Sequence, residues 1–235
     1  MNVTNEMPWR RLAAGTDHDE PVAEHGRSPA SAEAARQTPC FTPGTRIKTL
    51  RGDVDVADIR AGDRVLTRDS GYREVAWAGE RRLVEADLVA HPALRPVVIE
   101  KDAFGPGCPS RRMMVSPQHQ LLLGGVEAQL LFGSEEVLVP ARTMLGRVGI
   151  GRGRVRDGVT YVHFMFESHE IVLGDDLWTE SFQPNASSLD ALLDDQKAEI
   201  YALFPELEAA DDAPGRFTSA RPALKGHEAR VLTAA

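Results

Sequence analysis

Cysteine is scarce in this chain of 235 residues, which has only Cys40 and Cys108. Two cysteines are too few for a disulfide framework, and they do not imply an oxidising compartment. Zinc accepts cysteine and histidine ligands, and His119, His163 and His169 would be further candidates, but the chain has no CxxC pair. We therefore predict no structural metal and no cofactor. Adventitious, inhibitory zinc at a cysteine and histidine site is the alternative.

Long apolar runs are missing as well. No stretch approaches the roughly 20 apolar residues that a membrane helix needs. No apolar run follows the basic pair Arg10-Arg11, where a cleavable signal peptide would require one. We therefore expect no membrane partner and no cleavable signal. The cytoplasm is the default location, and export by a route without an N-terminal signal is the alternative.

Basic residues are fewer than acidic ones: the chain has 27 Lys and Arg and 35 Asp and Glu, which gives a formal net charge of −8. Such an acidic chain is not expected to bind bulk nucleic acid or an anionic membrane. One basic stretch, residues 146–158, carries four arginines among glycines. We interpret it as a solvated hairpin tip rather than as a nucleic-acid site, and we predict no nucleic-acid partner.

Composition divides the chain into four parts. Residues 1–39 are rich in Ala, Ser, Gly and Pro without helical or strand periodicity, which predicts a flexible leader. Residues 40–184 are nearly neutral and form the expected folded domain, whereas the acidic excess lies in the flanks. Residues 185–208 are predicted to be a helical appendage, and residues 209–235 a disordered tail.

The middle block has the pattern of an all-β domain. Short runs rich in β-branched residues alternate with turn signals such as Arg51-Gly52-Asp53 and Ala61-Gly62-Asp63. Near its end, Gly174-Asp175-Asp176 separates two such runs and predicts a hairpin turn. Many short strands at close spacing predict a barrel or another compact β-fold.

One helix is expected beyond the β-block. Apolar residues from Leu189 to Phe204 recur at helical spacing, Ser187 and Asp190 resemble a capping box, and Pro205 ends the pattern. We interpret this amphipathic helix as a packing element or as a docking element for a protein partner.

Cys40 lies at the junction between the loose leader and the first predicted strand. Its thiol is adjacent in sequence to the carbonyl of Pro39, so attack there would convert an amide into a thioester. The shift is uphill unless the carbonyl is polarised and the departing amine receives a proton. Water or a small thiol could then cleave the thioester.

Ser116-Pro117-Gln118-His119 is the second candidate element. Two polar side chains three residues apart, joined by a turn that contains proline, can converge on one point. The imidazole of His119 could deliver the proton to the leaving amine, because its reference pKa is near neutral. The hydroxyl of Ser116 could hold the scissile peptide by a hydrogen bond, or it could only cap a turn.

The third element is the segment from Tyr161 to Glu170. His163 lies in an otherwise apolar strand, where a polar side chain needs a partner. His163 could be the base for the Cys40 thiol, could activate water against the thioester, or could make a structural hydrogen bond. His169 lies at the end of this strand, and a structural role is the preferred interpretation.

These three elements, in this order, resemble the Hint superfamily, and most of all its bacterial Hedgehog/intein-type members. The resemblance is carried by CFTPGT, VSPQH and YVHFMFESHEIVLGDDLWTESF, covers residues 40–184 and extends into the following helix. It implies a compact Hint β-fold and autoprocessing. It also implies that Cys40 is the nucleophile, that Ser116 and His119 match the family's Thr-x-x-His pair, and that His169 matches a family histidine. His163 falls where many Hint domains carry an acidic residue or a cysteine.

The sequence departs from the family at the end of the domain. Inteins end in His-Asn followed by Ser, Thr or Cys, and Glu180 and Ser181 occupy the places of His and Asn here. Neither can form the succinimide that frees the C-terminal flank. The sequence thus predicts N-terminal cleavage or acyl transfer at Pro39–Cys40 without splicing, with the chain's own N-terminal peptide as substrate. The alternative is a silent Hint module that binds a protein partner through its C-terminal helix.

Overall fold

The computed structural model describes residues 39–190, 192–209 and 217–234. The predicted leader therefore lies outside the described residues, except for Pro39. In the described residues, thirteen antiparallel strands form three sheets with short helices beside them, so the predicted all-β fold class is confirmed. Of the helices in these ranges, none has the length and hydropathy needed to cross a bilayer.

The largest sheet has eight strands in the order β2-β1-β3-β12-β13-β8-β9, with β4 paired to β3. Its strands are β1 (Arg46–Thr49), β2 (Gly52–Asp55), β3 (Arg64–Thr67), β4 (Gly71–Glu74), β8 (Gln120–Gly124), β9 (Glu136–Pro140), β12 (Ile171–Gly174) and β13 (Leu177–Glu180). A second sheet pairs β10 (Ile150–Arg152), β6 (Val97–Ile99) and β7 (Met113–Val115), and a two-stranded ribbon pairs β11 (Val159–Met165) with β5 (Trp77–Leu83).

The predicted hairpin turn is confirmed. Asp175 and Asp176 connect β12 to β13, and both have positive φ angles, 47° and 62°. Two consecutive residues in the left-handed region match the right-handed twist of the flanking strands, and Asp tolerates this region better than most residues. The turn fixes the register that pairs Ile171 with Glu180.

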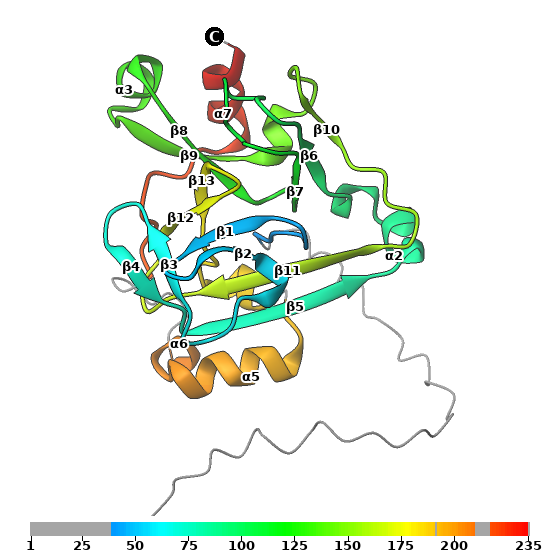
Figure 1. The fold of residues 1–235 in the computed structure, drawn as a ribbon, viewed down its shortest axis with the longest axis vertical. Coiled ribbons are helices and arrows are strands. Elements are labelled where there is room, and N and C mark those ends of the chain that lie inside the picture. Colours follow the sequence, from blue (N-terminus) through cyan, green and yellow to red (C-terminus); the bar gives the residue numbers. More distant parts are fainter. Residues whose placement is uncertain (1–38, 191, 210–216, 235) are drawn as a thin grey trace, which may run out of the picture.

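In the β5–β11 ribbon, β11 is buried on both faces from Tyr161 to Met165, whereas β5 exposes Glu80 and Arg82. Phe164 and Val162 point into the main core, whereas Trp77 and Met165 face a second apolar cluster together with Phe182. Figure 1 shows this ribbon running across the molecule between the large sheet and the helix α5 (Asp194–Leu203). Because this part of β11 is covered on both sides, the polar side chain of His163 is removed from solvent.

The other helices are short. They are α2 (Glu85–Ala90), α3 (Val126–Phe132), α4 (Ala186–Leu189), α6 (Glu206–Ala209) and α7 (Gly226–Ala234), with 3-10 turns at Val56–Asp58, Pro92–Leu94 and Ala141–Met144. The expected continuous helix from Leu189 to Phe204 is wrong in its extent. The chain ends α4 at Leu189 and is extended at Leu193 (ψ 153°) before α5 begins. This break lets Leu189 and Leu192 enter the same apolar cluster as Ile200 of α5.

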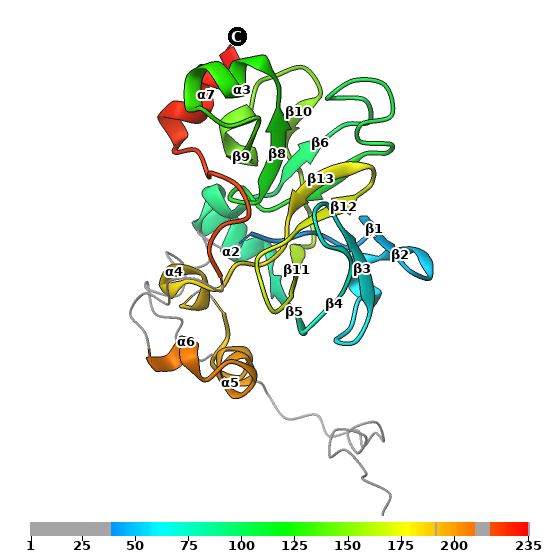
Figure 2. The same cartoon turned by 90° about the vertical axis from the view of Figure 1, so that its left-hand side faces the viewer.

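The expected disordered tail is also wrong for residues 217–234. Leu224 N–H donates to Leu138 O, and Leu138 N–H donates to Pro222 O, so this segment pairs with β9. Leu224 and Ala229 are buried in the main core. Figure 2 shows the segment rising past β9 to end in α7 beside α3. Few apolar residues anchor it, and they lie among charged and alanine residues, so no periodic pattern revealed it.

Candidate active site

The backbone of Phe41 connects two strands that are distant in sequence. Its N–H donates to Val162 O (3.0 Å), and Val162 N–H donates to Phe41 O (2.9 Å). On its other side, Phe41 forms an antiparallel bridge with Val115 at the end of β7. The residue before Phe41 must therefore lie opposite the residues that follow Val115 and Val162. This register brings Cys40 between Ser116 and His163.

Ser116 holds the backbone of Cys40 from one side. The N–H of Cys40 donates to Ser116 Oγ (2.9 Å), and the N–H of Ser116 donates to Cys40 O (2.9 Å). The turn that follows is closed by the N–H of His119, which donates to Ser116 O (3.1 Å). The amide nitrogen of the Pro39–Cys40 bond is thus fixed by a hydroxyl group.

His163 contacts the other side of the same peptide bond. Its Nδ1 lies 3.2 Å from Pro39 O, and its Nε2 lies 3.8 Å from Cys40 Sγ. A carbonyl oxygen can only accept, so Nδ1 must carry a hydrogen and donate it. In the neutral ring, Nε2 then presents its lone pair to the thiol. Burial lowers the pKa of His163 to about 4, against the smaller raising effect of the Pro39 hydrogen bond, so the ring is neutral at pH 7.

His119 lies beside Phe41, the residue that follows Cys40, and has a different environment. Its ring meets that of Phe41 edge-on, with the centroids 4.4 Å apart. Within the described residues, neither ring nitrogen has a hydrogen-bond partner, although the side chain is only 1% exposed. Burial, with a smaller contribution from the neighbouring His163, lowers the pKa of His119 to about 3. His119 is therefore an unpaired, neutral imidazole in the resting protein.

The Cys40 thiol is enclosed by apolar side chains. The residue is 4% exposed, and its neighbours come from the end of β5, the α2 region and β11: Leu83, Leu88, Leu94, Val159 and Tyr161. Burial raises the pKa of the thiol far above its usual range, and the charge of Glu180 raises it further. A hydrogen bond with Ser116 and the charge of Arg81 oppose the effect. A free thiolate is therefore scarce here.

Of the five residues predicted from the sequence, Cys40, Ser116 and His163 meet at the Pro39–Cys40 bond. His119 packs against the ring of the neighbouring Phe41, and His169 does not join them. His169 Nδ1 accepts the N–H of Ala220 (3.0 Å), and Nε2 lies 3.5 Å from Glu180 Oε2. Glu180 in turn accepts the N–H of Gln120 (2.9 Å). Within the described residues, His169 thus connects β13 to the C-terminal segment and makes no hydrogen bond with Cys40.

Arg81 and Glu180 are two charged residues near Cys40 that the sequence did not indicate as site residues. Arg81 lies on β5 directly opposite Tyr161 of β11. It acts electrostatically on both the Cys40 thiol and His163. No local motif marks Arg81, and Glu180 was singled out only as a departure at the end of the domain, because the pairing of distant strands is what brings both residues to the site.

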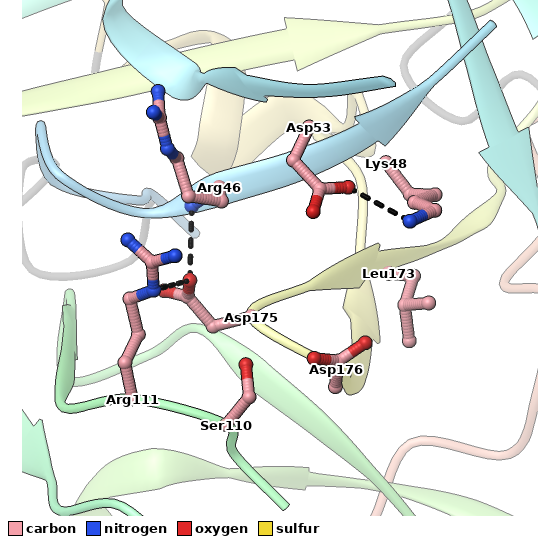
Figure 3. A pocket seen from close by; sticks show the side chains of 8 residues that line it. All are labelled: Arg46, Lys48, Asp53, Ser110, Arg111, Leu173, Asp175 and Asp176. Atoms are coloured by element: carbon pink, nitrogen blue, oxygen red, sulfur yellow. Dashed lines mark hydrogen bonds and ion pairs between the residues drawn. The ribbon is translucent and has the colours of Figure 1, made fainter. Parts of the chain in front are cut away.

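A second polar cluster lies away from this site, at the β12–β13 turn (Figure 3). Asp175 Oδ1 accepts the N–H of Arg46 (3.3 Å) and lies 3.1 Å from Arg111 Nε, while Lys48 pairs with Asp53. The pocket volume is about 20 Å³, which is room for one water molecule. The ion pairs of Arg111 with Asp175 and of Lys48 with Asp53 give the cluster the character of a structural brace of the turn.

No group of three or more His, Cys, Asp or Glu side chains in the described ranges could hold a metal ion. Cys108, the other cysteine, is half-buried in the loop between β6 and β7. Burial, reinforced by the charge of Asp176, raises its pKa. Cys108 is thus a passive thiol in the described structure.

Comparison with known proteins gives one match at the level of a family. The family model of the Hint domain matches residues 39–186. Similar solved structures include the gp41-1 intein (14% identity, 60% of this chain and 97% of that chain, TM-score 0.37). They also include a bacterial intein-like domain from Clostridium thermocellum (16%, 62% and 98%, TM-score 0.40). A splice-inactive variant of the AceL NrdHF class 3 split intein is 12% identical, with 62% and 99% covered and a TM-score of 0.41. No curated protein matches the sequence.

Proposed function

Because this chain belongs to the Hint domain family, a family of self-processing domains, we propose that its Cys40 attacks the peptide bond that precedes it. In this N-to-S acyl shift, Sγ bonds to the carbonyl carbon of Pro39, and the Pro39–Cys40 amide becomes a thioester. Water or a small thiol then releases residues 1–39. The protein's own N-terminal peptide is therefore the substrate.

This proposal rests on two side-chain hydrogen bonds to the Pro39–Cys40 peptide group, one to its N–H and one to its carbonyl oxygen. Ser116 Oγ accepts the amide N–H at 2.9 Å, and His163 Nδ1 donates to the carbonyl oxygen at 3.2 Å. A buried peptide bond in a structural strand would normally be satisfied by backbone partners. Side chains on both of its polar atoms, beside a cysteine, are the arrangement that amide cleavage needs.

His119 is proposed as the proton donor to the leaving nitrogen. The shift moves one proton in total, from the sulfur to the nitrogen of Cys40, so no outside acid is required. His119 is neutral at rest because its pKa is about 3. His119 can therefore donate a proton to the leaving nitrogen only after it has received the proton that the Cys40 thiol releases.

The end of the domain supports cleavage without splicing. Glu180 and Ser181 stand where inteins have His and Asn, and both are buried. Ser181 Oγ accepts the N–H of Glu170 (3.1 Å), and Ser181 N–H donates to Glu170 O (2.9 Å). Residues that follow, including Leu224, belong to the main core. The C-terminal flank is thus part of the fold rather than a releasable segment.

The test is intact-mass analysis of wild type, Cys40→Ala and Cys108→Ala at neutral pH, with and without dithiothreitol. We expect wild type and Cys108→Ala to give residues 1–39 and 40–235, faster with thiol, and Cys40→Ala to stay intact. Cleavage in Cys40→Ala, or at another bond, would rule out the proposed route. An intact wild-type chain under every thiol condition would rule out self-cleavage by this protein.

One observation favours a second candidate, a silent Hint domain that acts through a protein partner. The Cys40 thiol is buried, with a raised pKa. The helical appendage gives this candidate little support, because Ile200 of α5 packs against Trp77 and Phe182 of its own chain. Among the described residues of α5 and its N-cap, the exposed large apolar side chains are Leu193 and Leu203. The mass experiment separates the two candidates.

A further inference from the structure

His163 touches both reacting groups of the Pro39–Cys40 bond. Its two ring nitrogens point to different atoms: Nδ1 to the carbonyl oxygen of Pro39 (3.2 Å) and Nε2 to Cys40 Sγ (3.8 Å). The antiparallel pairing of Phe41 with Val162 forces this position, since it places residues 40 and 163 opposite each other. A ring held in this way can give a hydrogen bond at one end and take a proton at the other.

We infer that His163 is a bifunctional catalytic residue, which removes the thiol proton with Nε2 while its Nδ1–H stabilises the negative charge that develops on the Pro39 oxygen. The inference rests on the proposed acyl shift and adds to it the group that polarises the carbonyl. In this role, His163 replaces the separate base and oxyanion donor that acyl transfer usually requires.

The steps balance. The Sγ–H proton moves to Nε2 as Sγ bonds to the carbonyl carbon, and the C=O π pair moves to oxygen, where Nδ1–H holds it. The oxygen pair then re-forms C=O, the C–N bond breaks, and its electron pair stays on the Cys40 nitrogen. That nitrogen takes up one proton, which the imidazolium returns directly or by way of His119. The ring ends neutral and ready for hydrolysis of the thioester.

The surroundings of the ring suit this role. His163 is 3% exposed, and the ring of Phe182 meets it edge-on with the centroids 5.7 Å apart. Burial strengthens a hydrogen bond to an oxyanion, because little water competes for it. The charged or titratable groups that face His163 are Arg81 on β5, His119 and Cys40. Arg81 disfavours a protonated ring, so Nε2 keeps its lone pair for the thiol.

Two amide variants separate the two contacts. In His163→Asn the amide nitrogen reaches about as far as Nδ1, so the variant keeps a donor for the carbonyl and loses the base. In His163→Gln the amide nitrogen reaches about as far as Nε2, so the variant loses the carbonyl donor as well as the base. The rate of leader release is measured by intact mass in dithiothreitol, from pH 6 to pH 9.

We expect His163→Asn to be about 100- to 10,000-fold slower than wild type, the range for loss of a general base. Its rate should rise about tenfold per pH unit, because hydroxide must then form the thiolate. His163→Gln should cleave about 100- to 1000-fold more slowly than His163→Asn, which is the range for loss of an oxyanion donor. Equal rates in the two variants would refute the carbonyl role, and a wild-type rate in His163→Asn would refute the role as base.

A readout that needs no turnover tests the same geometry. In full-length Cys40→Ala labelled with 15N-histidine, the shifts of His163 should show a protonated Nδ1 and an unprotonated Nε2 at pH 7. The double variant Cys40→Ala/His163→Gln, which lacks this signal, assigns it. Shifts that show His163 protonated at Nε2 alone, or at both nitrogens, would overturn the inference even if the wild-type protein cleaves itself. If wild type stays intact while the Nδ1–H ring is found, the proposed function fails and the geometry stands.

Discussion

Acid should unfold this protein through its two buried imidazoles. His119 and His163 are neutral in the folded state, with pKa values lowered by burial to about 3 and about 4. In the unfolded chain each takes up a proton near pH 6.5. Between pH 6.5 and the folded-state pKa, unfolding therefore binds protons, and the free energy of unfolding falls as the pH falls.

The size of the effect follows from the width of that window. Each histidine costs about 1.4 kcal/mol for every pH unit below 6.5, so the pair costs roughly 7 kcal/mol by pH 4. This is comparable to the whole stability of a typical domain, about 5–15 kcal/mol. Asp175 opposes the trend between pH 6 and 4, because burial raises its pKa to about 6. It is only half-buried, so its contribution is smaller.

The assay is urea unfolding of Cys40→Ala, followed by tryptophan fluorescence at steps from pH 7.5 to 4.5. The free energy of unfolding should decline steeply below pH 6.5. In His119→Gln or His163→Gln chains, also carrying Cys40→Ala, the slope should fall by about one proton. An unfolding free energy that is the same at pH 7 and pH 5 would refute the assignment of both rings as buried and neutral.

Two further predictions concern packing around the site. Gly79→Ala should cost about 1–3 kcal/mol by urea unfolding, because its Cβ would come 2.5 Å from the Trp77 ring; Gly151→Ala, where nothing lies within 4 Å, is the control. A cost no larger than that of the control would contradict this packing. Leu224→Ala should cost about 2–5 kcal/mol, whereas Val231→Ala, at a site that is 55% exposed, should cost little. Equal, small costs would mean that the C-terminal segment does not stabilise the core.

Residue types along the sequence predicted the turn and the fold class, because both depend mainly on the conformations that neighbouring residues prefer. The Gly174-Asp175-Asp176 turn was predictable because its residue types tolerate positive φ angles. The all-β class followed from short runs separated by turn residues. The position of Cys40 at a junction and the Ser-x-x-His spacing marked Cys40 and Ser116 as candidates, and the family resemblance supported placing them together.

Other features depend on contacts that no local pattern encodes. Arg81 reaches the site only through the pairing of β5 with β11, which are more than 70 residues apart. The break before α5 could not be predicted, because Leu192 and Leu193 fit the helical period although the chain is extended at Leu193. His169 was a candidate site residue through the family resemblance, although a structural role was the preferred interpretation, and its partners in the structure are Ala220 and Glu180.

One cause, burial, shapes both the nucleophile and its proposed base. It raises the pKa of the Cys40 thiol and lowers that of His163, so a thiolate–imidazolium pair is strongly disfavoured before attack. On the proposed route, the thiol proton therefore moves to His163 at the same time as the bond forms between Sγ and the carbonyl carbon of Pro39. The negative charge must pass directly from sulfur to the Pro39 oxygen, where the Nδ1–H of His163 holds it. On the proposed route, the apolar cover over Cys40 disfavours a free thiolate, and attack on the Pro39 carbonyl proceeds without a full negative charge on sulfur.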